Sequence, residues 1–159
     1  WARVKLDSGE IRLAPGMALT LNGIAQGFVA DKVADLLRAE GLNRILIDTG
    51  ELSALGPQPD GTPWPVTLDA GAGTLALADR ALATSAPLGT VFDAAGTVGH
   101  ILHPATGRPA PALWQIVSIS APSAALADAL STAGCLMTSR AAIVAAVSAF
   151  PSARLEAAV

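Results

Sequence analysis

Short apolar segments separated by glycine and proline turns run through most of this chain and limit the folds open to it. Helical spacing of apolar residues interrupts them only over about 22–40 and 123–150. The strands and helices do not alternate regularly. The sequence therefore predicts an α+β fold, with a mixed or antiparallel sheet and two to three packed helices. At 159 residues the chain is most simply one domain.

The individual elements can be placed by residue. The segment 11–21 reads as strand-like on both sides of a Pro15-Gly16 turn. Asn22 is expected to cap a helix that runs to about Glu40 and ends at Gly41. The apolar positions of this helix are Ile24, Phe28, Val29, Val33, Leu36 and Leu37. Further strands are expected at 44–48, 52–56, 64–68, 74–79, 81–85, 114–121 and 153–159, helices at 123–139 and 140–150, a hairpin turn at 93–96 and a loop at 104–111.

Composition and charge exclude several classes of protein. Hydrophobic residues make up 52% of the chain and charged residues 14%, which indicates a compact fold rather than disorder. A net charge of −3 provides no basic surface for nucleic acid or anionic lipid. No apolar run approaches the roughly 18 residues needed to span a membrane. The chain starts at Trp1 without an initiator methionine or a signal-like segment, so we expect it to belong to a longer polypeptide.

The one cysteine, Cys135, excludes an internal disulfide and a cysteine-rich zinc cluster. Its apolar neighbours in an expected helix predict a packed, unreactive thiol.

Asp128 and Thr132 form the first candidate site. Residues four apart on a helix lie on one face, with Cβ atoms about 5–6 Å apart. A carboxylate and a hydroxyl are hard oxygen donors suited to Mg²⁺. The alternative is that Asp128 is exposed or caps a helix, while Thr132 bonds back to a carbonyl. The apolar residues around the pair favour the site, because a buried carboxylate needs a partner.

Two further segments could bind an anion. The glycine-rich run NGIAQG, Asn22 to Gly27, opens a helix, where free N–H groups and the helix dipole attract phosphate. In GHILHPATGRP, His100 and His103 could act as a base and a ligand, although two histidines make an incomplete metal site. The turn 106–108 could present N–H groups and a guanidinium to an anion. Each segment could equally be an ordinary turn or surface loop.

Taken together, the order of these segments resembles the ApbE family of flavin transferases, the FAD:protein FMN transferases formerly called thiamine-biosynthesis lipoproteins. The typical blocks of that family are DLGGIAKG, GGD, ATSGDY, HIIDPRTG and ADALATA. The resemblance runs from about Met17 to about Met137, and the retained residues are Gly23, Ile24, Ala25, Gly27, Thr84, Ser85, His100, Ile101, Pro104, Thr106, Gly107, Ala127, Asp128, Ala129, Leu130 and Thr132. It implies an ApbE-like, T-fold type of domain, of which this chain is a C-terminal fragment that lacks the N-terminal part.

The resemblance also implies the chemistry. Family members bind FAD and Mg²⁺, transfer FMN to a threonine hydroxyl of an acceptor protein and release AMP. It makes Asp128, Thr132 and a backbone oxygen near Ala25 the metal ligands, and His100 and Asp128 the catalytic residues, with His100 orienting a phosphate or accepting the hydroxyl proton. The flavin nucleotide would contact Thr20, Asn22, Gly23, Gln26, Thr84, Ser85, His100, Ile101, Thr106 and Gly107.

A respiratory or electron-transfer subunit is the acceptor that the resemblance implies. It also implies a periplasmic or other extracytoplasmic location. A lipid anchor on the full-length protein is compatible with the resemblance.

Several positions depart from the family blocks. The first block has Thr20, Asn22 and Gln26 in place of Asp, Gly and Lys, and GGD reads Gly50-Glu51-Leu52. TSGDY becomes TSAPL, and the Asp and Arg of the fourth block become His103 and Ala105. These losses keep three alternatives open: a flavin-binding accessory protein, an FAD pyrophosphatase that yields FMN and AMP, and a domain that has kept only the fold.

Overall fold

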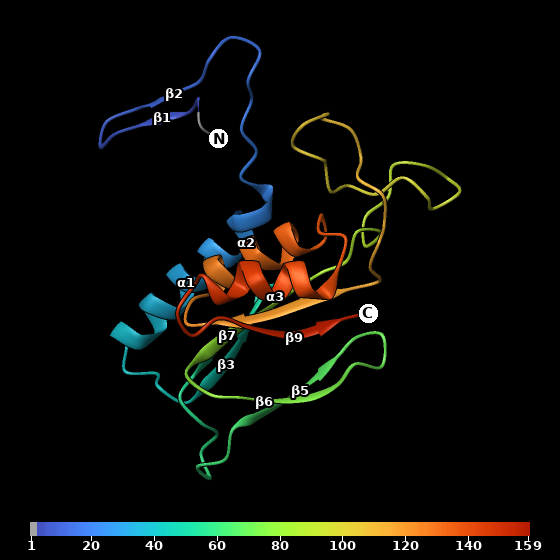
Figure 1. The fold of residues 1–159 in the computed structure, drawn as a ribbon. Coiled ribbons are helices and arrows are strands. Elements are labelled where there is room, and N and C mark those ends of the chain that lie inside the picture. The colour runs from blue at the N-terminus through green and yellow to red at the C-terminus, as the bar shows by residue number, and fades with distance from the viewer. Residues whose placement is uncertain (1–2) are drawn as a thin grey trace.

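A five-stranded antiparallel sheet forms the centre of the computed structural model, which describes residues 3–159 (Figure 1). Its strand order is β3 (Ile45–Asp48), β4 (Leu52–Leu55), β7 (Arg80–Ser85), β8 (Val117–Ala121) and β9 (Arg154–Ala158). Every neighbouring pair is antiparallel. The predicted α+β class is confirmed, and the sheet is antiparallel rather than mixed.

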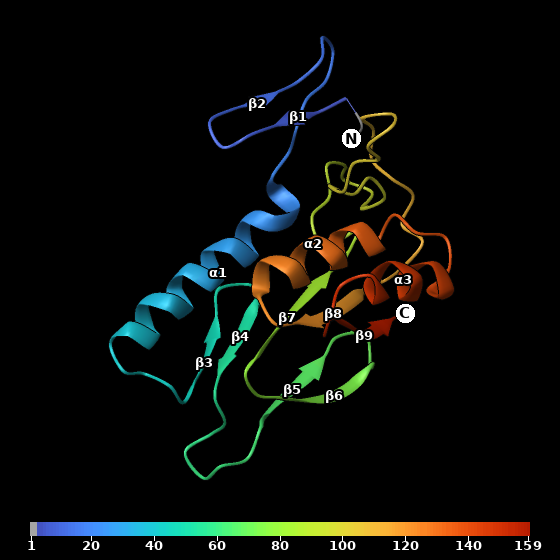
Figure 2. The same ribbon diagram turned by 60° about the vertical axis from the view of Figure 1, so that its left-hand side comes forward.

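Three helices of the described chain lie together on one face of this sheet, α1 (Asn22–Ala39), α2 (Ala124–Gly134) and α3 (Arg140–Ser148) (Figures 1 and 2). The hairpin of β5 (Trp64–Leu68) and β6 (Gly73–Leu77) covers the opposite face. Side chains of a strand alternate between the two faces of a sheet. Ala81 and Ala83 of β7 therefore pack under the helices, while Leu82 packs against the hairpin.

Helix α1 begins and ends where the sequence predicts, but Asn22 does not cap it. The N-cap position is Leu21, whose side chain makes no capping bond, and Gly23 is kinked out of helical geometry. The amide of Asn22 donates instead to Oγ1 of Thr20 at 3.2 Å. Gly41 terminates the helix in the left-handed region, at φ +82°, as predicted.

The buried face of α1 consists of small residues, Gly27, Ala30 and Ala34. Large apolar residues would hold α1 away from α2, because a Cβ on Gly27 would lie 2.3 Å from the backbone oxygen of Ala124. Of the apolar positions that define the helical period, Val33 and Leu37 pack against Ile47 and Leu55, whereas Ile24, Phe28, Val29 and Leu36 are exposed.

The segment before α1 is less regular than predicted. Only Ile11–Arg12 forms a strand, β2, which pairs with β1 (Lys5–Leu6), and the two make a hairpin that projects from the body of the molecule (Figures 1 and 2). The Pro15-Gly16 turn is present, closed by a bond from the Met17 amide to the Ala14 oxygen at 3.0 Å. The predicted strand after this turn is wrong, because no neighbouring strand pairs with residues 17–21.

The remaining predicted strands and helices are present, with two adjustments. The helical region after 123 is broken between Gly134 and Arg140, and Ser123 and Ser139 each cap the helix that follows. The 93–96 turn is held by the Asp93 carboxylate, and its arms make a single bridge, Val91 to Gly99, instead of paired strands. In residues 3–159 no helix is both long and apolar enough to cross a membrane.

Cys135 lies in the core beneath α2 and α3, with 1% of its surface exposed. Burial raises the pKa of its thiol to about 12. Because the thiolate is the reactive form, this burial explains why the residue acts as a packed side chain.

Candidate functional site

The start of α1 meets α2 at Asp128. The amide of Gly27 donates to Oδ2 of Asp128 at 3.0 Å, across 101 residues of sequence. Only 4% of Asp128 is exposed. Burial raises the pKa of this carboxyl, and the Gly27 hydrogen bond acts against that rise. The alternative of an exposed Asp128 is therefore wrong, and its carboxylate is a buried group that the N-terminal part of α1 holds in place.

Thr132 lies one turn further along α2, next to Gly23 and Ser85. Its Oγ1 is 3.2 Å from the Ser85 hydroxyl, which is also 2.7 Å from the Ser131 hydroxyl. A Cβ on Gly23 would lie 2.8 Å from Cγ2 of Thr132 and 3.2 Å from its Oγ1. The glycine thus lets the α1 backbone approach the Thr132 side chain closely. Gly23 is therefore the glycine of this segment that lies beside Thr132, and the backbone oxygen near Ala25 stays a predicted ligand.

Glu51 is the residue that the sequence analysis missed. It directly precedes β4, with 6% of its surface exposed, and its Oε2 has no hydrogen-bond partner. Burial first, and then the charge of Asp128, raise the pKa of the Glu51 carboxyl to about 7, while the Thr84 amide donates to it and acts against that rise. The available signal was an acidic residue next to a glycine at the end of a buried strand. Matching GGD to Gly50-Glu51-Leu52 placed Leu52 at the acidic position instead.

Gln26 links α1 to the loop that carries Glu51. Its Nε2 lies 3.0 Å from the position that a Cβ on Gly50 would occupy. Gly50 has φ +97°, a conformation that L side chains rarely adopt. The Gln26 side chain can therefore lie across the Gly50 backbone, one residue from Glu51 in sequence.

Two buried carboxylates and a hydroxyl are a donor set that a hard cation such as Mg²⁺ prefers. Within residues 3–159 the ion pairs join Arg12 to Glu10 and Asp35 to Lys32 and Arg38, so none reaches Asp128 or Glu51. No group of three or more acidic, histidine or cysteine side chains converges in that range. The unpartnered Glu51 oxygen and the absence of an ion pair to either carboxylate in that range fit a bound cation. Three protein ligands would leave coordination positions free for phosphate oxygens.

The structure brings only some of the other candidate residues to this cluster. Thr84 and Ser85 lie at the end of β7, where Thr84 Oγ1 is 2.8 Å from the Ser118 hydroxyl. Asn22 and Ala25 are exposed on the first turn of α1, beside Thr20. Ile101 is buried among Val117, Ile119 and Leu130 in the core below α2 and α3.

His100 and the turn at Thr106 and Gly107 belong to the long loops between β7 and β8. His100 is exposed, with Nδ1 3.2 Å from the Thr90 oxygen, and the Gly107 amide donates to the His103 oxygen at 2.9 Å. The turn lines a cavity of about 590 Å³ with Arg3 and the 16–18 segment. This cavity is therefore built from loops rather than from the sheet and its helices, and His100 is not part of its lining.

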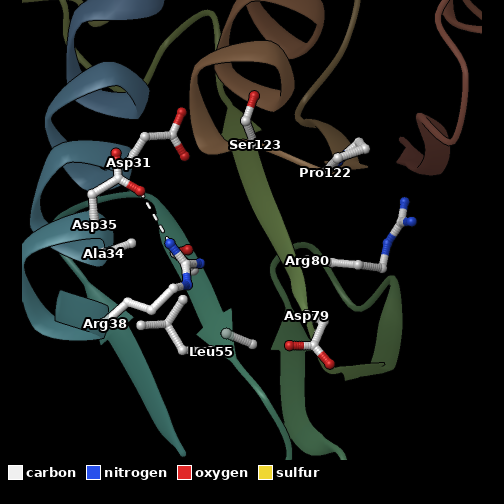
Figure 3. A pocket seen from close by; sticks show the side chains of 11 residues that line it. Asp31, Ala34, Asp35, Arg38, Leu55, Asp79, Arg80, Pro122 and Ser123 are labelled. Atoms are coloured by element: carbon white, nitrogen blue, oxygen red, sulfur yellow. Dashed lines mark hydrogen bonds and ion pairs between the residues drawn. The ribbon is translucent and has the colours of Figure 1, made fainter. Parts of the chain in front are cut away.

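A separate cavity of about 410 Å³ is lined by residues of α1 and β4, by the start of β7 and by the segment between β8 and α2, and Figure 3 shows its charged lining. Asp31 accepts hydrogen bonds from the Ala124 and Ala125 amides at 2.7 and 2.9 Å, so it caps α2. Arg38 pairs with Asp35 at 3.0 Å (Figure 3). Because these charged groups already have partners within the protein, this cavity is a weaker candidate than the Asp128 cluster.

The class of domain is therefore α+β: an antiparallel sheet with three helices on one face and an oxygen-rich cluster where α1 contacts α2. The chain belongs to the ApbE family, whose model matches residues 1–154. It is 36% identical over 135 residues to the FAD:protein FMN transferase of Treponema pallidum, covering 74% of this chain and 37% of that protein. With the Escherichia coli K12 protein of the same name it shares 30% over 127 residues, 74% of this chain and 36% of the relative.

Solved structures agree with this membership. The ApbE protein of Thermotoga maritima matches with a TM-score of 0.77 at 29% identity, over 91% of this chain and 50% of that one. The apo flavinyl transferase ApbE of Pseudomonas stutzeri matches with a TM-score of 0.70 at 32% identity, over 85% and 44%. The chain therefore spans somewhat more than a third of its curated relatives and about half of these solved chains.

Proposed function

We propose that this chain contributes the cation and phosphate side of a FAD:protein FMN transferase. The observation that carries the proposal is the buried Asp128, held by the Gly27 amide one helical turn from Thr132. The names of the relatives supply the reaction class. Asp128 and Thr132 would hold Mg²⁺, which when bound would neutralise charge on the FAD pyrophosphate.

In the proposed reaction the oxygen of an acceptor threonine forms a bond to the phosphorus of the FMN half of FAD. The bond between that phosphorus and the oxygen of AMP breaks, AMP leaves with the bonding electrons, and the hydroxyl proton passes to a base. Such a transfer needs charge neutralisation and in-line positioning more than covalent help. The protein meets the positioning requirement with a carboxylate and a hydroxyl fixed on α2, the first by Gly27 and the second by Ser85.

The acceptor in this proposal is a subunit of a respiratory or electron-transfer complex. The reaction takes place outside the cytoplasm, and a lipid anchor on the full-length protein would hold the enzyme at the membrane. The support is family membership alone. Co-expression of the full-length protein with such a subunit, fractionated into cytoplasmic and extracytoplasmic material, would locate both the enzyme and its labelled product.

Asp128→Asn is expected to reduce FMN transfer at least about 100-fold, because it removes the charge that would bind the cation. Asparagine keeps an oxygen that can accept the Gly27 amide, so the variant should fold. The measurement is covalent flavin fluorescence of the acceptor in a denaturing gel, after co-expression with the full-length protein.

Asp35→Asn, on the exposed side of α1, is the matched control and should transfer FMN at the parental rate. Parental labelling by Asp128→Asn would refute the proposed role of Asp128. FMN and AMP without a labelled acceptor would identify a pyrophosphatase, and bound FAD without turnover would identify an accessory flavin-binding protein.

His100→Ala tests the second proposed catalytic residue. If His100 accepts the hydroxyl proton, its loss should slow transfer by roughly 100-fold, at the low end of general-base contributions. The residue is exposed on a loop, so the substitution should leave the melting temperature unchanged. Transfer at the parental rate in the same gel assay would remove His100 from the mechanism.

A further inference from the structure

The Glu51 carboxylate is enclosed by the same chain segments that hold Asp128 and Thr132. On one side, Glu51 accepts from the Thr84 amide, and the next residue, Ser85, contacts the Thr132 hydroxyl. On the other side, Gly50 lies under the Gln26 side chain, and the amide after Gln26 is the one that binds Asp128. Two routes of contact thus lead from Glu51 to the two residues of the proposed metal pair.

Burying the two carboxylates of Glu51 and Asp128 close together costs free energy unless a positive charge accompanies them. Glu51 and Asp128 are both buried, and the Glu51 Oε2 has no hydrogen bond. A buried carboxylate without a partner is strongly unfavourable unless it is protonated or bound to a cation. No lysine or arginine of residues 3–159 forms an ion pair with either carboxylate. The α1 side chain that reaches the Gly50 loop is Gln26, which is neutral.

We propose that Glu51 supplies a second carboxylate to the cation site of Asp128 and Thr132, so that its unpartnered oxygen is a ligand of a divalent cation of the Mg²⁺ type. This inference rests on the cation site of the proposed function and extends it to a side chain from the sheet. The resulting donors come from α2 and from the residue that precedes β4. A purely structural Glu51 would not make cation affinity depend on its charge.

Mn²⁺ is a suitable probe, because it takes the same oxygen ligands as Mg²⁺ and its free form is counted directly by electron paramagnetic resonance. The full 159-residue chain is titrated with Mn²⁺ alone and in the presence of FAD. Glu51→Gln should lower Mn²⁺ affinity at least about tenfold, the lower end of the loss caused by removing a partner of a metal site. Glu51→Asp, which keeps a carboxylate on a shorter side chain, should retain part of that affinity.

Glu40→Gln is the matched control, since it makes the same chemical change at an exposed position beyond α1 and should bind Mn²⁺ like the parent. Circular dichroism without metal checks that Glu51→Gln is folded, and its melting temperature should equal or exceed that of the parent. Mn²⁺ should raise the melting temperature of the parent and of Glu40→Gln more than that of Glu51→Gln.

Parental Mn²⁺ affinity in Glu51→Gln would overturn the inference, as would a parent chain that binds no Mn²⁺ with or without FAD. Failure of the proposed function gives a different result. A full-length protein that labels no acceptor, while its Mn²⁺ binding still depends on Glu51, would refute the transferase and leave the cation site in place.

Discussion

Gly27→Ala is expected to lower the melting temperature by about 4–8 °C. The new Cβ would lie 2.3 Å from the Ala124 oxygen and 2.6 Å from its carbonyl carbon, and both are backbone atoms that cannot rotate away. Separating α1 from α2 costs about 3 kcal/mol, the upper part of the range for overpacking, and each kcal/mol shifts the midpoint of a domain this size by about 2–4 °C. The gain of about 1 kcal/mol from replacing a helical glycine by alanine offsets only part of that cost.

The same substitution should also disturb the site, because the Gly27 amide binds Asp128. Differential scanning calorimetry measures the stability effect. Gly9→Ala is the control, since a Cβ there meets only the Asp7 carboxylate, at an ordinary 3.6 Å. A melting temperature for Gly27→Ala within 2 °C of the parent would show that α1 and α2 do not pack as closely as the structure has them.

The second large effect concerns pH. In the absence of divalent cations, the free energy of unfolding should fall as pH rises from about 4.5 to about 7 and should level off above that. The pKa of Glu51 is about 7 in the folded chain and 4.5 in the ordinary state, so in this window the folded chain binds more protons than the unfolded chain. Stability then decreases with pH. The raised pKa of Asp128 acts in the same direction at the acidic end.

The difference between these pKa values of Glu51 corresponds to a loss of about 3 kcal/mol at most. Urea denaturation in EDTA at several pH values measures it. Because other groups titrate in the same window, the comparison is between the parent and Glu51→Gln, which cannot titrate at position 51 and should lose less stability toward pH 7. Parallel curves for the two proteins would show that Glu51 does not carry the effect.

Much of the local structure followed from local signals. Helix α1 ends at Gly41 because glycine accepts the left-handed conformation there, and the spacing of Asp128 and Thr132 places both on one face of α2. The strands flanking Asp79-Arg80 were also visible as short apolar runs. In each case a few neighbouring residues contain all the interactions that the prediction needs.

Contacts between helices and strands could not be predicted from neighbouring residues. The apolar period of α1 suggested that Phe28 and Leu36 face the core, yet both are exposed, because close approach to α2 requires Gly27, Ala30 and Ala34 on that side. The strand expected after Gly16 failed for a related reason, since a strand needs a neighbour to pair with.

By itself, the sequence determined the order of the strands and helices from α1 onward, the fold class and the position of Asp128 and Thr132 on one face of a helix. These features depend mostly on residues close together along the chain. The tertiary structure alone decided that Gly27 binds Asp128 across 101 residues and that Gly23 lies against Thr132. It also decided that Glu51 is buried with an unpartnered oxygen near Asp128. The physical reason is that burial, close approach and the field between two charges depend on distance in space, which spacing along the chain does not specify.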